Sequence, residues 1–534
     1  MKPFDSHGIF RTPGEANGLR RLAVQGAAIT IFVQALGFAL QMIATVILAR
    51  LLTPSDFGLL AMVTTFSSLL LSFLQIGFPE AVAQREQLDH LLASNLFWIS
   101  VGLGLLLMTG FASASPLLAK AFHDPRVVPV ALGVSPAILL TSTSVLHLAL
   151  LKRAMRFPAV SVVDIVARAI SVVASIVLAA AGWGYWALVV GVIAQPMVLT
   201  IGAWALCQWL PGLPRRGAGT ASVAGFAIGV NGRGILAYLT TNVDNVLVGW
   251  RFGPSGLGFY KKAYELFVLP SNQFLSVYSV AVSALSRLIR NPAQYKRYFL
   301  SGLSMLAFVG MGVGVGLTLV GNDLVRLLLG AKWETTGRIF TCFGPGIGFL
   351  LIYRTHGILQ LSLGSTRRYV YWGIVELAVT GTLFLLALPW GPSGIAVAWS
   401  VSSLILTLPA FWYAGKPIQL GATAVLATIW KYVLASLLAG SACFAITREL
   451  PFLVATLAAT GSLSRLLITS CLFVLLYFGG VILLHGGCDP FYQFASFARD
   501  IIPGGRGLPA SRPVVDSTYG PHAPVASTPT SIST

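Results

Sequence analysis

Residues 48–60 read LARLLTPSDFGLL, and residues 248–260 read VGWRFGPSGLGFY. Shifting one stretch by 200 positions aligns three identical pairs: Pro54 with Pro254, Ser55 with Ser255 and Gly58 with Gly258. In both copies an apolar run ends, a Pro-Ser turn follows, and a second apolar run begins near an aromatic residue. This period is far longer than that of a solenoid repeat. It predicts two related halves of one membrane protein that meet around a shared centre.

The composition indicates a membrane protein, because 56% of the 534 residues are hydrophobic and only 10% are charged. A soluble domain has about 25% charged residues. Apolar runs long enough to cross a bilayer recur along the chain, and in lipid such runs must be helical. We therefore expect an all-α polytopic protein with about fourteen transmembrane helices, near residues 23–49, 57–78, 91–115, 127–150, 159–181, 185–209, 222–250, 258–285, 298–320, 339–363, 369–389, 393–414, 428–446 and 464–484.

The expected domains follow from the repeat. Six helices per half is an even number, so the halves should be parallel repeats related by an axis along the membrane normal. We expect an N-terminal segment at 1–22, a six-helix bundle at 23–209, a linker at 210–221, a second six-helix bundle at 222–414, two additional helices at 415–485, and a tail at 486–534 that is disordered after about residue 503.

Charge sets the expected orientation. The net charge is +18, and most of the 35 Lys and Arg residues fall in segments that share one side of the membrane with both termini. The positive-inside rule then places the N-terminal segment, the linker and the tail in the cytoplasm. In a protein of this class we attribute the basic balance to anionic lipid and to an internal cavity, and we expect no nucleic-acid partner.

Three stretches resemble a known family: ARLLTPSDFGLLA at 49–61, LLKRAMRF at 150–157 and DNVLVGWRFGPSGLGFYKKAYEL at 244–266. They are similar to polysaccharide exporters of the Wzx type, which are flippases of the multidrug/oligosaccharidyl-lipid/polysaccharide exporter superfamily. The resemblance covers roughly residues 20–485. It implies a V-shaped pair of six-helix bundles around a central cavity in the bacterial inner membrane. It also implies an oligosaccharide cargo on undecaprenyl pyrophosphate for exopolysaccharide, capsule or O-antigen synthesis, membrane lipids and polysaccharide polymerase or export machinery as partners, and no cofactor.

Span seven carries the strongest group of polar residues. Arg233 and Asp244 are eleven residues apart, about three helical turns, and so share one face. Asn242 and Asn245 flank Asp244. One interpretation is a cavity wall in which Arg233 binds a pyrophosphate. The alternative for Asp244 and Asn245 is a structural pairing with a neighbouring helix.

Span ten carries Arg354 on one side and His356 with Gln360 on another. We expect all three to line the same substrate cavity. Pro345 lies upstream in this span, and Pro136 lies at a similar position in span four. Prolines in matching spans of two halves predict hinges, although a tolerated kink is the alternative.

Spans one, five and eleven add further candidates. Gln34 and Gln41 lie on one face of span one and suit either sugar hydroxyls or hydrogen bonds between helices. Asp164 and Arg168 have i,i+4 spacing, so they form either a structural ion pair or a cavity-lining pair. Asp164 and Glu376 are the candidates for coupling to protons or sodium, because carboxylates within spans are rare.

Two transport functions and one enzymatic function remain to be compared. A flippase moving an anionic headgroup by alternating access needs a cationic cavity, which the arginines supply. A cation-coupled exporter of small drugs, the alternative within the same superfamily, would need acidic residues to dominate. A membrane enzyme would need a large outer loop with catalytic side chains, and we find no paired-carboxylate, metal-ligand or other catalytic spacing. We therefore expect a flippase that is not an enzyme and has no metal site.

Overall fold

The computed structural model describes residues 16–75, 88–215, 234–273, 275–450 and 461–501, together with residues 3, 4, 10 and 82. These residues are helical apart from short turns and one isolated bridge between Phe4 and Phe10. The predicted all-α class is confirmed. The chain divides into a large unit, Met1–Gly486, and a small unit, Gly487–Thr534. The small unit contains the amphipathic helix α20 (Asp489–Ile501).

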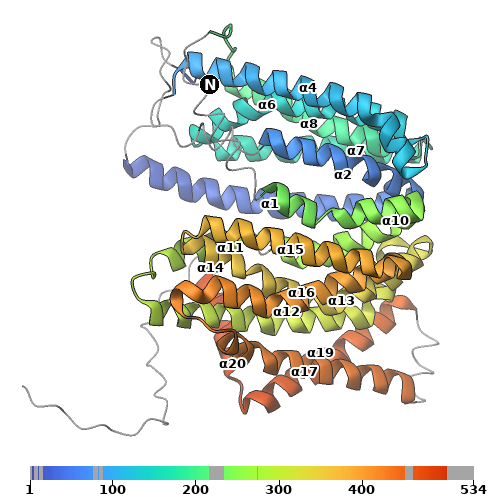
Figure 1. Cartoon of the computed structure of the whole chain (residues 1–534), viewed down its shortest axis with the longest axis vertical. Helices are drawn as coiled ribbons and strands as arrows, with labels where there is room; N and C mark the ends of the chain where they lie inside the picture. The colour runs from blue at the N-terminus through green and yellow to red at the C-terminus, as the bar shows by residue number, and fades with distance from the viewer. Residues whose placement is uncertain are drawn as a thin grey trace, which may run out of the picture. The chain divides into compact units, whose positions relative to one another are not determined.

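The first six-helix bundle follows the expected order along the chain (Figure 1). Its helices are α1 (Ala16–Leu51), α2 (Pro54–Gln75), α4 (His90–Phe122), α5 (Val127–Val134), α6 (Pro136–Arg153), α7 (Phe157–Ala180) and α8 (Tyr185–Cys207). Helices α5 and α6 act as one interrupted crossing, because only Ser135 separates them. Helix α7 packs on α1 and α8, and α6 packs on α4 and α8.

The second bundle has the same succession of long helices. Its described elements include a helical stretch at 234–240, followed by α10 (Val243–Gln273), α11 (Leu275–Ser286), α12 (Pro292–Leu329), η1 (Ala331–Trp333), α13 (Glu334–Arg354), α14 (His356–Ser362), α15 (Thr366–Ala387), η2 (Leu388–Trp390) and α16 (Gly391–Gly415). After η3 (Lys416–Ile418), two further helices, α17 (Ala422–Glu449) and α19 (Ser462–His485), pack on each other and on α12. The sequence predicts this pair as an addition to the repeat.

Eleven helical stretches of the described chain are long and apolar enough to cross a membrane. One of them, Arg367–Ile418, contains both α15 and α16. Because α10 is interrupted at Gly253 and supplies further helical segments, these stretches agree with roughly fourteen crossings. In lipid a helix satisfies its own backbone hydrogen bonds, which is why these apolar runs adopt this structure.

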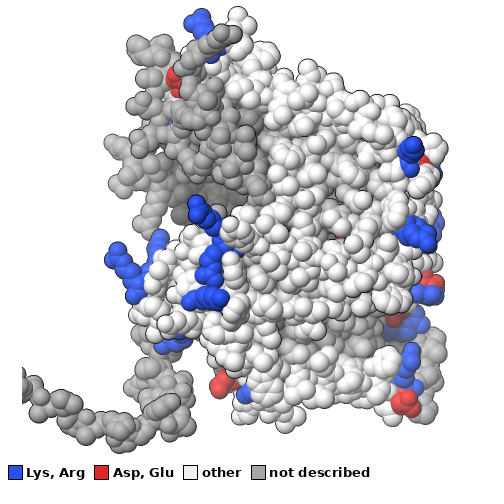
Figure 2. All heavy atoms as spheres, in the orientation of Figure 1, with Lys and Arg blue, Asp and Glu red and all other residues white. Residues whose placement is uncertain are grey.

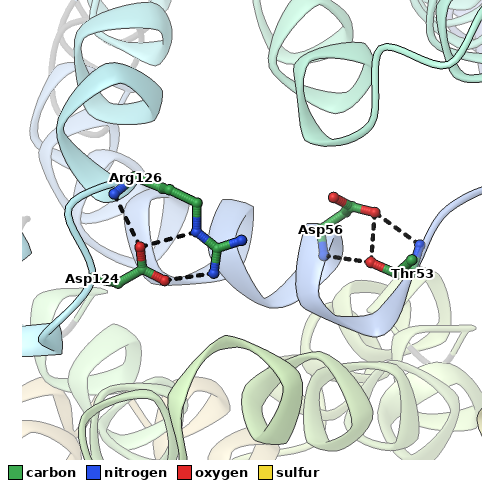
Figure 3. A network of polar contacts seen from close by, with 4 residues as sticks. All are labelled: Thr53, Asp56, Asp124 and Arg126. Carbon is green, nitrogen blue, oxygen red and sulfur yellow. Dashed lines mark hydrogen bonds and ion pairs between the residues drawn. The ribbon is translucent and has the colours of Figure 1, made fainter.

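The repeated turn explains where its helices begin. In the first copy Thr53 caps α2: Asp56 Oδ2 accepts hydrogen bonds from the Thr53 backbone N–H at 2.9 Å and from Thr53 Oγ1 at 2.7 Å (Figure 3). Thr53 Oγ1 accepts in return from the Asp56 N–H at 3.4 Å. This is the reciprocal arrangement of a capping box, and Pro54 at the first helical position fits it.

The second copy turns by a different device. Gly253 interrupts α10 with a φ of 69° and a ψ of −172°, a conformation that residues with a side chain rarely adopt. The two segments of α10 fold back on each other, because Tyr260 Oη donates to Asp244 Oδ2 at 2.7 Å. In a straight helix these residues would be about 24 Å apart. Both copies therefore turn the chain between two helical segments, one turn ending in a helix cap and the other made at a glycine.

Glycines allow the helices to pack closely. A Cβ atom at Gly314 of α12 would lie 3.0 Å from the Gly344 carbonyl oxygen of α13. Gly312 presents the neighbouring face of α12 to α19, where a Cβ atom would lie 2.7 Å from the Tyr477 ring. Small residues at such crossings let backbones approach in a membrane. The two glycine faces of α12 thus hold the second bundle and the additional helix pair together.

The surface has the charge distribution of a membrane protein. Figure 2 shows few charged side chains across the middle of the visible face, while Lys, Arg, Asp and Glu gather toward the two ends of the helices. Large apolar side chains face outward along this band, including Leu475 and Leu483 of α19. A water-soluble protein does not expose apolar surface on this scale.

Candidate functional site

The first bundle contains a cavity of about 750 Å³ between α1, α6, α7 and α8. Four of the residues selected from the sequence line it: Gln34 and Gln41 from α1, and Asp164 and Arg168 from α7. The cavity lies within the first bundle, alongside α1, which runs along the boundary with the second bundle in the view of Figure 1. Candidates that the sequence places in separate spans are therefore neighbours in space.

The Asp164–Arg168 ion pair forms part of this wall. Arg168 Nε donates to Asp164 Oδ2 at 2.9 Å, as the i,i+4 spacing predicts. Their side chains keep 43% and 35% exposure for Arg168 and Asp164, so the pair is open to the cavity and not sealed in the core. A Cβ atom at Gly37 of α1 would lie 3.8 Å from Arg168 Cδ. The stem of Arg168 therefore lies next to α1 at Gly37, at a distance that would still leave room for a methyl group.

Two further residues of the cavity carry a charge or an amide that the sequence does not mark as part of a site. Lys152 comes from the last turn of α6, and Gln195 comes from the middle of α8. Lys152 falls just after the predicted end of span four at residue 150, where the sequence predicts a loop and not a cavity wall. Gln195 is an amide in an otherwise apolar span, a signal that the sequence contains. With Lys152 and Arg168 against Asp164, the wall has an excess of positive charge.

The residues of span seven occupy the core of the second bundle. Asp244 is fully buried and accepts hydrogen bonds from Tyr260 Oη at 2.7 Å and from Trp399 Nε1 at 2.9 Å. Asn245 Nδ2 donates to Asn242 Oδ1 at 3.1 Å. Asp244 thus ties both segments of α10 to α16, and none of these three residues lines the cavity. Arg233 lies outside the described residues.

The residues of span ten are separated by a break in the helix. Helix α13 ends at Arg354, and α14 begins at His356. His356 and Gln360 are buried, and His356 Nδ1 lies 2.7 Å from the Tyr353 carbonyl oxygen. Arg354 is half-buried and forms no ion pair with any carboxylate of the described chain. None of the three lines the cavity of the first bundle, and an anion-binding role for Arg354 stays a prediction.

The proposed hinges and the second coupling candidate have distinct surroundings. Pro136 starts α6 directly after the interruption at Ser135. Pro345 lies inside a continuous α13, and the break in that crossing comes later, at Thr355. Glu376 is half-buried on α15. Within the described part of the chain, no group of three or more His, Cys, Asp or Glu side chains is arranged to hold a metal ion.

The two bundles contact each other at the repeated turns. A Cβ atom at Gly58 would lie 1.7 Å from the Pro254 carbonyl oxygen, and one at Gly258 would lie 1.8 Å from the Pro54 carbonyl oxygen. The contact is reciprocal, as expected for two related halves that meet at their symmetry axis. We call these four residues and Trp333 the seal. The glycines on which the sequence repeat is built are thus the points of closest approach between the bundles.

Side chains reinforce the seal from both bundles. Trp333 is fully buried, and its Nε1 donates to the Ala49 carbonyl oxygen of α1 at 2.8 Å. Its ring packs edge to face on Phe57 of α2, with centroids 5.5 Å apart. Lys262 Nζ of α10 lies 4.3 Å from the Phe57 ring centroid and 2.8 Å from Glu265 Oε2. A desolvated cation over an aromatic face is stabilising, so these contacts strengthen the packing of the two bundles at the seal.

A polar cluster lies at the same end as the seal. Asp124 accepts two hydrogen bonds from the Arg126 side chain, at 3.0 Å and 2.7 Å, and one from its backbone N–H at 3.0 Å (Figure 3). These bonds lower the pKa of the Asp124 carboxyl. A shallow hollow of about 440 Å³ next to it is lined by Trp250 and Arg251 of α10. The loop after α4 and the turn of α10 thus line the same hollow.

Comparison with known sequences places the chain among proteins of polysaccharide synthesis. It is 22% identical over 416 residues to the lipopolysaccharide biosynthesis protein WzxC of Escherichia coli (strain K12), a match that covers 75% of this chain and 82% of that protein. It is 24% identical over 383 residues to the teichuronic acid biosynthesis protein TuaB of Bacillus subtilis (strain 168), covering 70% and 78%. It is 21% identical over 349 residues to the succinoglycan biosynthesis transport protein ExoT of Rhizobium meliloti (strain 1021), covering 65% and 70%.

Comparison with solved structures gives the fold. The lipid II flippase MurJ in an inward closed conformation superposes with a TM-score of 0.66 at 16% identity, over 89% of this chain and 99% of that one. An inward-facing multidrug resistance MATE family transporter of the MOP superfamily superposes with a TM-score of 0.58 at 13% identity, over 75% and 99%. Residues 47–337 match the family described as "Polysaccharide biosynthesis protein", and the chain belongs to that family.

Proposed function

We propose that this protein is a flippase that moves an oligosaccharide linked to a polyprenyl diphosphate across the bacterial inner membrane. The cavity in the first bundle carries this proposal, because it offers the two kinds of group that such a headgroup needs. Lys152 and Arg168 supply cations for phosphate, and Gln34, Gln41 and Gln195 supply amides for sugar hydroxyls. Membership of a family named for polysaccharide biosynthesis and a fold shared with a lipid II flippase support the same reading.

The charged headgroup and the lipid tail have opposite solvent requirements. A charge at the centre of a bilayer costs several kcal/mol, so the headgroup needs an enclosed polar path. The polyprenyl chain remains in the hydrocarbon, where its transfer costs nothing. In this proposal the seal closes one end of the path while the headgroup occupies the cavity, and the bundles then rock apart at Gly58 and Gly258.

We also propose an orientation in which the seal faces away from the cytoplasm and both termini lie in the cytoplasm. The support is the positive-inside pattern of the sequence. Undecaprenyl diphosphate as the carrier and the polymerase or export machinery as partners remain parts of this proposal. The relatives are named as proteins of lipopolysaccharide, teichuronic acid and succinoglycan biosynthesis, which supports a saccharide cargo.

Export of small cationic drugs coupled to cation entry fits the cavity less well. Such a function needs a carboxylate that is available to a cation. Asp164, the one carboxylate among the described residues that line the cavity, is already paired with Arg168 at 2.9 Å. The excess of positive charge on the wall disfavours a cationic substrate.

Deletion of the gene in the source organism tests the proposal. We expect surface polysaccharide to be lost and its lipid-linked oligosaccharide precursor to accumulate in the inner membrane. The wild-type gene should reverse both effects, whereas Arg168→Ala should reverse neither while reaching the same abundance in the membrane. Normal polysaccharide and no accumulated precursor in the deletion strain would refute a flippase function.

A further inference from the structure

We propose that Asp164 is an internal counter-ion which Arg168 exchanges for a phosphate of the cargo, so that the carboxylate and the diphosphate compete for one guanidinium. In this proposal the diphosphate is held between Arg168 of α7 and Lys152 of α6, and Asp164 takes Arg168 back when the cargo leaves. The inference rests on the proposed function and assigns a regulatory role to one carboxylate of that cavity.

The geometry of the pair leaves Arg168 able to bind a second group. The contact uses only Nε, which lies 2.9 Å from Asp164 Oδ2. The two terminal nitrogens of Arg168 form no hydrogen bond with any other described residue. A guanidinium presents five N–H groups in a fixed fork that matches phosphate oxygens. Arg168 can therefore engage an incoming phosphate before it releases Asp164.

The pair is also weak enough to exchange. A partly exposed pair with a single contact contributes about a fivefold factor or less to an equilibrium. The protein contains a contrasting pair, in which Arg126 binds Asp124 through two side-chain contacts and the carboxylate is only 10% exposed. A structural role favours the geometry of Asp124, and an exchangeable role favours that of Asp164.

The charges of the wall fit this exchange. A diphosphate diester carries two negative charges, and the wall provides two cations, Lys152 and Arg168, on different helices. In the absence of cargo, the positive charges of Lys152 and Arg168 would repel each other across the cavity. Asp164 reduces that repulsion, and the same carboxylate weakens cargo binding. We therefore expect a site whose affinity for the headgroup is moderate, so that the headgroup both binds and dissociates during a transport cycle.

A binding measurement on the full-length protein in lipid nanodiscs tests this role, with farnesyl diphosphate as the probe. We expect Asp164→Asn to bind the probe about three- to fivefold more tightly than the wild type, because the competing charge is gone while the shape is kept. Asp164→Glu, which keeps the charge, should bind like the wild type. Arg168→Gln and Lys152→Gln should each weaken binding about tenfold or more.

The matched control is Glu334→Gln. Glu334 and Arg338 form another i,i+4 ion pair, at 2.7 Å, outside the cavity, so its loss should leave probe binding unchanged. Unchanged or weaker binding by Asp164→Asn, with wild-type thermal stability, would overturn the exchange and leave the flippase proposal intact. If Asp164→Asn does not fold, weaker binding by Asp164→Glu than by the wild type would overturn it equally. A wild-type protein that binds no farnesyl diphosphate would instead contradict the proposed function itself.

Discussion

Replacing Gly58 by alanine should open the seal. In the closed arrangement the new methyl group would lie 1.7 Å from the Pro254 carbonyl oxygen, and real contacts of this kind are essentially never under 3.0 Å. Because the obstacle is backbone, α2 and α10 must move apart by about 1.3 Å, the difference between these two distances. Overpacking of this kind costs about 1–3 kcal/mol, which shifts the equilibrium from closed to open about 5- to 150-fold.

Spin labels at the seal end of each bundle measure this shift. Trp183 precedes α8 and Trp390 precedes α16, and both side chains are exposed. After replacement of the five native cysteines, labelled cysteines at these positions give the distance distribution by pulsed electron paramagnetic resonance. We expect Gly58→Ala to increase the population with the longer distance and to reduce polysaccharide export, since a flippase must also reach the closed state.

Two comparisons make this prediction specific. Gly258→Ala should act like Gly58→Ala because the contact is reciprocal, and the double variant should fall short of the sum, because one separation relieves both clashes. Gly110 of α4 faces open space, so Gly110→Ala should leave the distances and export unchanged. A Gly58→Ala distribution that coincides with that of the wild type would refute the close approach at the seal.

Three further predictions concern other contacts. Trp333→Phe removes the hydrogen-bond donor to the Ala49 carbonyl of α1, a loss of about 1 kcal/mol. The population with the longer label distance should therefore increase, but by less than in Gly58→Ala. A distance distribution equal to that of the wild type would argue against this hydrogen bond. Arg126 lowers the pKa of the Asp124 carboxyl in the folded protein. The ion pair therefore stabilises the fold above the pKa of an unfolded Asp carboxyl, about 3.9, and this stabilisation is lost as the pH falls through the lower pKa of the folded state. The melting temperature of the wild type should therefore exceed that of Asp124→Asn at pH 6 and approach it near pH 3; a gap that widens in acid would contradict this. Arg354→Ala should abolish export at unchanged membrane abundance, and normal export would remove it from the anion path.

The repeat in the sequence was informative because it reports a contact. Pro54, Gly58 and their counterparts are set by local requirements, a helix start and a backbone crossing, which a short motif can encode. Trp333 belongs to the same seal but has no such motif, because its role depends on a bundle that lies far away along the chain. The spans were predictable for a similar reason: lipid imposes helices on any sufficiently long apolar run.

The cavity was only partly predictable. Helical spacing placed Gln34 with Gln41 and Asp164 with Arg168, since neighbours on one helix face follow from the period alone. The period does not say which face meets a cavity, and Asp244 proved to point into the core, where Tyr260 and Trp399 satisfy it. Lys152 was missed because the position of a helix end in the bilayer is a property of the packed bundle.

Flipping by the purified protein tests the central claim most directly. The full-length chain is reconstituted into liposomes that contain a fluorescent disaccharide linked to a polyprenyl diphosphate, and an external reagent then modifies the outer-leaflet lipid. We predict that wild-type protein brings nearly all of the labelled lipid within reach of the reagent, and that Arg168→Gln leaves about half protected, as in protein-free liposomes. Half protection with the wild-type protein would contradict the account.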